Sequence, residues 1–260
     1  MPTLTNRAPF TWDDIIARGE HLSRNHPPAQ ELLSLLVQIT KFQRDVSLGL
    51  ASMNGGCTGV QSILRFIPQL QALLDGLASQ PLREALSELG SHPAKWTELL
   101  SRFEEQSFDE DSPSRTFLAY LLMQPYAQHV TDKHKHEPEA ASPHCPVCRN
   151  RPLVSLLREY NQGAKRSLFC SMCFTEWEFQ RTRCTACGEE DHDKLPIYKA
   201  EQVRQARIEA CDTCMTYAKC IDLSRDGHAV PPADDLATLA LDVWAHEQGY
   251  RRLQPNILLL

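Results

Sequence analysis

The chain has 260 residues, 42% of them hydrophobic, and a formal net charge of −6 that arises from 27 basic and 33 acidic residues. The hydrophobic share is high enough for a folded core, which excludes extensive disorder. The acidic balance disfavours nucleic acid as a partner, because phosphate binding needs clustered lysine and arginine side chains.

The N-terminal segment has no targeting signature. Residues 1–12 lack the charged region and the apolar region that together make a secretory signal. No apolar run approaches the roughly 20 residues that cross a bilayer. We therefore expect a cytoplasmic protein without membrane insertion. In a reducing cytosol, paired cysteines are metal ligands or redox groups rather than structural disulfides.

Residues 1–130 are predicted to form a helical domain, a bundle of five or six helices. Thr11 precedes two aspartates in a pattern typical of a helix N-terminus. Pro68 and Pro125 fall inside predicted helices, where a proline is expected to kink or split the helix. The predicted helices cover residues 11–22, 28–46, 60–79, 81–89, 93–105 and 113–130.

Residues 131–143 are polar, mixed in charge and poor in large apolar side chains, which is typical of a linker. His134 and His136 lie in this segment and offer imidazole nitrogens to a metal. A solvated linker is the preferred interpretation, so neither histidine is assigned as a ligand.

From residue 144 onward, short runs with β-strand character alternate with pairs of cysteines. The spacing repeats, since 21 residues separate Cys148 from Cys170 and 23 residues separate Cys187 from Cys211. Two tandem β units, at 144–183 and 184–225, explain this repetition. The predicted strands cover residues 153–160, 166–169, 175–183, 195–199, 205–210 and 217–223.

The chain is predicted to end in an amphipathic helix over residues 234–247, within a C-terminal helix and tail at 226–260. Asp234 and Asp235 are expected to favour the start of this helix through its dipole, with a catalytic carboxylate pair as the weaker alternative. The fold class is therefore α+β. An N-terminal helical bundle precedes two tandem rubredoxin-like or zinc-ribbon β units and a C-terminal helix.

The cysteine pairs are the strongest chemical signal in the sequence. A Cys-x-x-Cys turn presents two thiolates side by side, and two such turns on a β-ribbon complete a tetrahedral four-thiolate shell. Each unit of about forty residues is too small for a self-sufficient core, so metal binding is expected to be a condition for its folding. The predicted ligands are Cys145, Cys148, Cys170 and Cys173 at the first site, and Cys184, Cys187, Cys211 and Cys214 at the second.

Two metal ions are expected, one at each site, and each is either zinc or iron. Four thiolates suit zinc and also mononuclear iron of the rubredoxin type. A closed shell leaves no position for a substrate, which disfavours hydrolytic catalysis, and no nucleophile–base arrangement or nucleotide motif is present. We therefore expect a protein that is not an enzyme. The alternative, that the pairs are dithiol redox centres, lacks the βαβ pattern of thioredoxin-like proteins.

Several other residues have two interpretations each. Cys57 is either a reactive thiol on a glycine-rich turn or a small buried residue, and Cys220 is expected in the core, so the roles of both stay open. His144 is either a hydrogen-bond donor to the first metal site or an ordinary loop histidine. Trp177 is expected to pack over the first ribbon.

The segments around the cysteines resemble the formate dehydrogenase accessory protein family, FdhE. The resemblance covers most of residues 145–256 and is looser in the N-terminal half, where it centres on residues 65–68. It rests on Cys145-Pro-Val-Cys148, the run from Leu168 to Trp177, Arg183-Cys184-x-x-Cys187-Gly188, the run from Asp234 to Asp242, Glu247-x-Gly249-Tyr250 and Arg252-x-x-Pro255-Asn256.

The resemblance implies a cytoplasmic protein needed for active respiratory formate dehydrogenases, which contacts their catalytic subunit during maturation before export. It also implies that the eight cysteines hold iron or zinc. The alternative is a rubredoxin-like redox protein that delivers electrons or sulfur to the client. A homodimer is possible in either case. Arg149 and Glu178 depart from the family pattern, which usually has a small residue and a histidine there.

Overall fold

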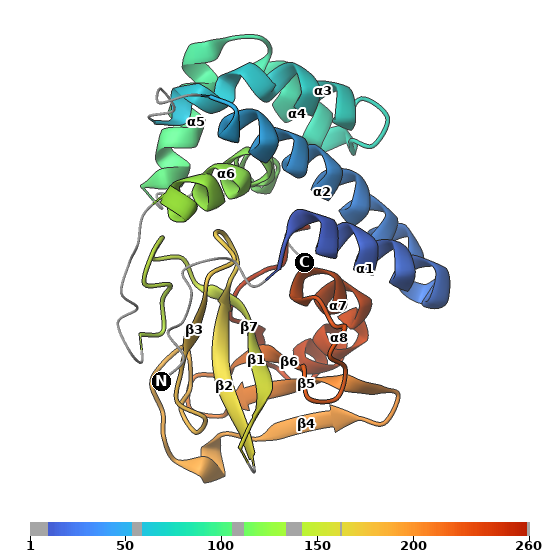
Figure 1. The fold of residues 1–260 in the computed structure, drawn as a ribbon, viewed down its shortest axis with the longest axis vertical. Helices are drawn as coiled ribbons and strands as arrows, with labels where there is room; N and C mark the ends of the chain where they lie inside the picture. Colours follow the sequence, from blue (N-terminus) through green and yellow to red (C-terminus); the bar gives the residue numbers. More distant parts are fainter. Residues whose placement is uncertain (1–9, 54–58, 106–111, 134–141, 162, 259–260) are drawn as a thin grey trace.

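The computed structural model describes residues 10–53, 59–105, 112–133, 142–161 and 163–258. The helical half lies at one end of the molecule, and the sheet with its C-terminal helices lies at the other (Figure 1). The predicted α+β architecture, with N-terminal helices, cysteine-rich β units and C-terminal helices, is confirmed. The described helices of the N-terminal half are α1 (Trp12–Asn25), α2 (Gln30–Ala51), α3 (Ile67–Leu74), α4 (Gln80–Leu89), α5 (Pro93–Glu104) and α6 (Pro113–Lys133).

Local sequence explains where the first helix begins. The Thr11 side chain accepts a hydrogen bond from the backbone N–H of Asp14, and the Asp14 carboxylate accepts one from the N–H of Thr11. This reciprocal capping box satisfies two donors that a helix end otherwise leaves unpaired. Ile15, Ile16 and Leu22 then form the buried face of α1, which packs on α2.

The two prolines that were predicted to kink or split helices have different outcomes. The segment 60–79 is split next to Pro68, as predicted, because a 3-10 helix at Val60–Phe66 leads directly into α3, and Pro68 lies in the first turn of α3. Proline suits this position, since the first N–H groups of a helix have no partner within the helix. Pro125 lies inside α6, which continues unsplit to Lys133. The start of the predicted 131–143 linker is therefore helical, and His134 and His136 lie outside the described residues.

The two predicted β units join into one sheet. The strand order is β3-β2-β1-β6-β5-β4, and β7 pairs with β6 off this path. Parallel pairing of β1 with β6, with Ser155 opposite Cys220, joins the first unit to the second. The strands are β1 (Pro152–Tyr160), β2 (Gly163–Cys170), β3 (Glu176–Glu178), β4 (Ile197–Ala200), β5 (Val203–Cys211), β6 (Thr216–Asp222) and β7 (Arg251–Arg252).

Two other expectations about these elements need correction. The strand predicted at 175–183 is the much shorter β3, which pairs only with residues 167–169 of β2. The single helix predicted at 234–247 is two helices, α7 (Pro231–Ala237) and α8 (Leu239–Glu247). Thr238 interrupts them with φ −113° and ψ 27°, because its hydroxyl bonds to backbone carbonyls of α7 and accepts from a buried lysine.

One hydrophobic core runs through both halves. Helix α1 contacts α7, and the aromatic rings of Trp12 and Phe174 lie 5.2 Å apart between centroids. Phe174 in turn stacks on Phe169 at 5.3 Å. The helical half is thus packed directly on the loop that carries the second cysteine pair. None of the helices in the described ranges combines the length and the apolar character that a bilayer crossing requires.

Candidate metal centres

The structure brings the eight cysteines together in the two predicted groups of four, and each group could hold a metal ion. At the first site, the Sγ atoms of Cys145 and Cys173 lie 3.5 Å apart, and those of Cys148 and Cys170 lie 3.3 Å apart. At the second site, the corresponding distances are 3.8 Å for Cys184 and Cys214 and 3.7 Å for Cys187 and Cys211.

These distances fit a tetrahedral ion rather than disulfides. Four thiolates about 2.3 Å from a central ion lie about 3.8 Å from one another, which is the spacing of the second site. A disulfide would require a sulfur–sulfur distance of about 2.05 Å. All nine cysteines in the described part of the chain are free thiols. The donor set therefore fits zinc or mononuclear iron, and all four donors at each site come from protein.

All four cysteine pairs lie on the same kind of turn. The residue after the second cysteine has a positive φ in each: Arg149 at 60°, Phe174 at 60°, Gly188 at 81° and Met215 at 53°. The turn points backbone N–H groups at the first sulfur, as from Ala186 and Cys187 to Cys184 Sγ at 3.3 and 3.5 Å. These donors stabilise thiolate charge. Arg149 thus has the left-handed backbone that glycine adopts at the least cost.

Replacing Gly188 with alanine is expected to destabilise the metal-loaded protein by about 1 kcal/mol, because a Cβ is strained at this positive φ. A Cβ there would meet nothing closer than the Arg183 side chain at 3.6 Å, so the cost comes from the backbone alone. Urea unfolding measures it. The control is Gly163→Ala in β2, where φ is not in the left-handed region. Equal effects of the two substitutions would contradict the role of the turn.

The first site is buried and is tied to the helical half. Ser171, between Cys170 and Cys173, uses its carbonyl oxygen to accept hydrogen bonds from the Tyr120 hydroxyl at 2.5 Å and from the Gln124 amide at 2.7 Å. Both donors are on α6. The Gln43 amide on α2 donates to Gln124 Oε1 at 2.9 Å. A chain of buried polar contacts therefore positions the Cys170–Cys173 turn of this site.

Burial makes it unfavourable for the four cysteines of the first site to ionise together without a metal ion. Burial raises the pKa of the Cys170 thiol well above its usual value, and the three neighbouring thiols raise it further. Hydrogen bonds with Cys145, Cys148 and Cys170 lower the pKa of Cys173. Four thiolates can share this space only when a cation compensates their charge, so metal uptake must release protons.

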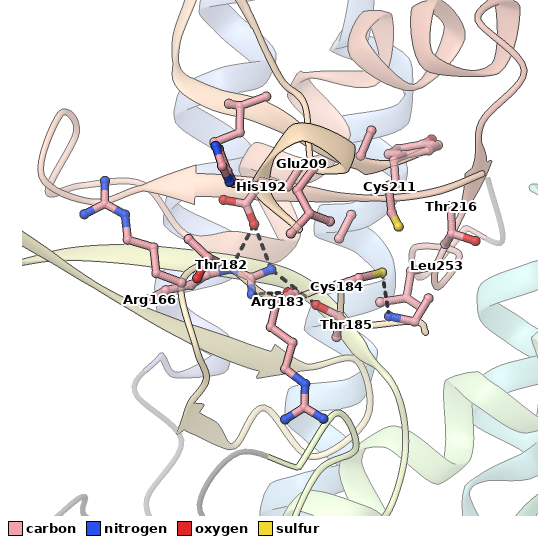
Figure 2. Close-up of a pocket in the computed structure, with 17 residues that line it drawn as sticks. Arg166, Thr182, Arg183, Cys184, Thr185, His192, Glu209, Cys211, Thr216 and Leu253 are labelled. Atoms are coloured by element: carbon pink, nitrogen blue, oxygen red, sulfur yellow. Dashed lines mark hydrogen bonds and ion pairs between the residues drawn. The ribbon is translucent and has the colours of Figure 1, made fainter. Parts of the chain in front are cut away.

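The second site is more open. Cys187 is exposed, and a cavity of about 240 Å³ lies beside Cys184 and Cys211 (Figure 2). Burial raises the pKa of Cys184 to about 12. The two sites thus have the same ligands but different access to solvent.

A buried arginine connects the two β units next to this cavity. Arg166 on β2 donates from Nε to the Glu209 carboxylate on β5 at 2.9 Å, and its other nitrogens reach the carbonyl of Arg183 and the hydroxyl of Thr185 (Figure 2). Burial opposes ionisation of Glu209, but the charges of Arg166 and Arg207 outweigh it and lower its pKa to about 2. The ion pair is therefore charged throughout the physiological range.

A second buried ionic network was not predicted from the sequence. Lys219 on β6 is fully buried and contacts Asp235 at 2.9 Å and Asp242 at 2.5 Å. Arg252 bonds to the same two carboxylates. Asp235 therefore does not act through the helix dipole as expected. The sequence contains one signal of this network. Lys219 lies among the apolar residues of a predicted strand, and a buried charge requires partners of opposite charge.

For Asp234 the expectation is confirmed in part, because it lies in the first turn of α7 and its carboxylate accepts a hydrogen bond from the N–H of Val230 at 2.7 Å. This carboxylate is fully buried and also accepts two hydrogen bonds from Arg18 of α1, at 2.9 and 2.6 Å. Arg18 also bonds to Asp226 at 2.6 Å. Burial raises the pKa of Asp234 in spite of Arg18. Asp234 thus joins the helical half to the C-terminal helices, and its carboxylate is engaged in structure rather than arranged for catalysis.

The other residues that the sequence singled out are placed as follows. Cys220 is completely buried in β6, as predicted for a core residue. Trp177 is buried, and its indole N–H donates to the Ser142 carbonyl at 2.8 Å. His144 is exposed in the loop before Cys145. Cys57 lies outside the described residues.

Two family models match adjoining parts of the chain. The central domain of FdhE matches residues 144–181, and the C-terminal domain of FdhE matches residues 182–259. Together they cover both cysteine clusters and the C-terminal helices.

The chain is also similar to known proteins of this family. It is 34% identical to the FdhE homolog of Aquifex aeolicus over 74% of this chain and 64% of that protein, and 30% identical to a Haemophilus influenzae FdhE homolog over 61% and 54%. The matched region thus spans less than two thirds of these relatives. The crystal structure of FdhE from Pseudomonas aeruginosa has a TM-score of 0.72 and 27% identity, over 96% of this chain and 97% of that chain. The matched domains, the relatives and the shared fold show that this chain belongs to the FdhE family.

Proposed function

We propose that this protein is a non-enzymatic accessory factor for the maturation of respiratory formate dehydrogenase, and that it binds the catalytic subunit of that enzyme in the cytoplasm. Membership of the FdhE family supports the link to formate dehydrogenase. The observation that carries the non-enzymatic role is the pair of closed four-cysteine sites. Because protein supplies all four donors at each site, neither ion offers a position at which a substrate could bind.

The architecture supports a role in holding a partner. A continuous core, the Ser171 contacts and the Arg18–Asp234 ion pair join the helices to the sheet. Both halves can therefore present one preformed surface, and a preformed surface loses little conformational entropy when a client binds.

Deletion of the gene tests this proposal. We expect the formate dehydrogenase polypeptide to accumulate at a normal level but without activity, and activity to return when the wild-type gene is supplied. A pull-down with the catalytic subunit tests direct binding, and a variant with Cys184 and Cys187 changed to serine tests whether binding needs the second site. Unchanged formate dehydrogenase activity in the deletion strain would refute the proposal.

The second candidate is a rubredoxin-like redox protein that passes electrons or sulfur to the client. One observation favours it, the exposure of Cys187 at the second site, since a ligand open to solvent gives a partner access to the centre. Iron is required for electron transfer, because zinc has no accessible second oxidation state. Metal analysis and absorbance of anaerobically purified protein distinguish the candidates. A colourless protein with two zinc ions per chain excludes electron transfer.

A further inference from the structure

A cavity of about 410 Å³ lies between the loops of the two cysteine clusters. His144 and Arg151 line it from either side of the first cysteine pair. Thr185, inside the third pair, and Thr216, just after the fourth, line it from the second cluster. Strand β7 closes it with Arg251 and Arg252. Both metal sites and the C-terminal strand therefore have to be folded for this cavity to exist.

The lining of this cavity is cationic in an acidic protein. Among the described residues, its lining contains three arginines and a histidine and no aspartate or glutamate, whereas the whole chain has 33 acidic and 27 basic residues. Arg252 is already neutralised by Asp235 and Asp242. Arg151 donates only to the backbone carbonyl of Leu253, at 3.4 Å, and has no carboxylate partner among the described residues.

Of the three arginines in the lining, Arg251 is the one most available to bind a ligand. Its side chain is exposed and makes no hydrogen bond or ion pair with the described part of the chain. Its backbone is nevertheless fixed, because its N–H donates to the Met215 carbonyl at 2.8 Å and the N–H of Leu253 donates to the Tyr217 carbonyl at 2.8 Å. A rigid strand thus holds an unpaired guanidinium at the edge of a concave, cationic space.

Two guanidinium groups without carboxylate partners, together with hydroxyl and imidazole groups, match the chemistry of a phosphate. Guanidinium binds phosphate oxygens through parallel N–H donors, and the cavity is within the usual size range of small-molecule sites. We propose that this cavity binds the phosphoryl group of a small organic phosphate. The inference does not depend on the identity of the client enzyme.

The cavity beside the second metal site has room for the rest of such a ligand. It shares four lining residues with the cationic cavity, among them Thr185, Thr216 and Leu253, which Figure 2 shows together at one side. Apolar side chains, including Leu195 and Ile197, form part of its wall. An ester with an aromatic or other apolar group therefore fits the pair of neighbouring cavities better than free phosphate does.

The competing explanation is that the arginines only balance the negative charge of the two centres. A divalent ion with four thiolates carries a net negative charge, and cations near it are stabilising. In that case Arg151 and Arg251 would support metal retention, and phosphate would have no specific site. Metal content and phosphate affinity, measured on the same variants, separate the two explanations.

Isothermal titration calorimetry of the metal-loaded, full-length protein at low salt tests the proposal. The probes are inorganic phosphate, phenyl phosphate and benzoate. We expect phenyl phosphate to bind most tightly and benzoate most weakly. The Kd for phenyl phosphate should rise about tenfold or more in both Arg251→Gln and Arg151→Gln, because each loses a charged hydrogen-bond donor. Arg251→Lys should lie between these and the wild type, since it keeps the charge but loses the two-pronged donor.

Arg204→Gln is the matched control, because Arg204 is an exposed arginine on the same sheet that does not line either cavity. Its Kd and metal content should equal those of the wild type. Absence of binding by both phosphates overturns the proposal, and benzoate binding as tight as phenyl phosphate overturns the assignment to phosphate. Loss of metal from the Arg151 and Arg251 variants, with unchanged phosphate affinity of the chains that stay folded, shows instead that the arginines balance the centres.

Discussion

A variant with both Cys170 and Cys173 changed to serine is expected to lose the first metal ion and to unfold the region around β1, β2 and β3. Removal of two thiolates abolishes high-affinity binding, and structural four-cysteine sites contribute about 10–16 kcal/mol near neutral pH. That amount is as large as the whole stability of an ordinary domain, about 5–15 kcal/mol. Metal analysis should fall from two ions per chain to one, and amide exchange of β1 and β2 should become fast.

The damage is expected to spread into the helical half. The Ser171 carbonyl in the Cys170–Cys173 turn accepts hydrogen bonds from Tyr120 and Gln124, and Phe174 packs on Trp12. When this turn is unfolded, two buried donors on α6 lose their hydrogen-bond acceptor, which costs about 1–3 kcal/mol for each group left unsatisfied. We therefore expect faster exchange in α6 as well.

Two matched variants give this experiment its controls. Cys220→Ala removes a buried cysteine that belongs to neither cluster, and it should retain both metal ions. The variant with Cys184 and Cys187 changed to serine removes half of the more exposed second site, and amide exchange in α6 should stay close to that of the wild type. Retention of two ions by the variant with Cys170 and Cys173 changed to serine would contradict the first metal site, and an identical spread of damage from both sites would contradict its specific coupling to α6.

The part of the site that could be predicted from the sequence is the part that depends on local spacing. A Cys-x-x-Cys turn fixes two sulfurs within four residues, and the ribbon between two turns brings four together. The eight cysteines could therefore be grouped by their order along the chain, and the structure places Cys145 with Cys173 and Cys184 with Cys214 accordingly. Whether they hold a metal in solution stays a prediction for metal analysis to test.

The pairing between the two β units and the break in the C-terminal helix could not be predicted from local spacing. Parallel pairing of β1 with β6 joins residues such as Ser155 and Cys220, which are 65 positions apart (220 − 155), and no local pattern specifies that register. The break at Thr238 depends on a hydroxyl that interacts with Lys219 and with carbonyls of α7. The helical periodicity of residues 234–247 contains no information about that tertiary contact.

The second large effect is expected at Lys219. Its ammonium group is fully buried and lies between Asp235 and Asp242, with the backbone carbonyl of Asp235 as a further acceptor at 2.6 Å. With Arg252, the four groups form a set with balanced charge. Lys219→Met removes one cation and leaves a buried carboxylate without compensation. Breaking a buried pair in this way typically costs 3–5 kcal/mol, and we expect a loss of about that size.

Urea unfolding of the metal-loaded protein measures this loss, with metal content checked to remain two ions per chain. Lys199→Met is the control, since Lys199 is exposed on β4 of the same sheet, and its effect should be within about 0.5 kcal/mol. An effect of Lys219→Met as small as the control would show that Arg252 alone compensates both carboxylates.

A double variant identifies charge as the cause. Adding Asp242→Asn to Lys219→Met removes the surplus carboxylate and leaves Arg252 paired with Asp235. We expect the double variant to be more stable than the sum of the two single losses predicts, with an interaction energy of roughly 0.5–3 kcal/mol. Strictly additive losses would mean that Lys219 stabilises the fold through packing of its side chain. Coupled losses would mean that the sheet tolerates a buried lysine because α7 and α8 each bring a carboxylate to it, while Arg252 of β7 balances the second negative charge.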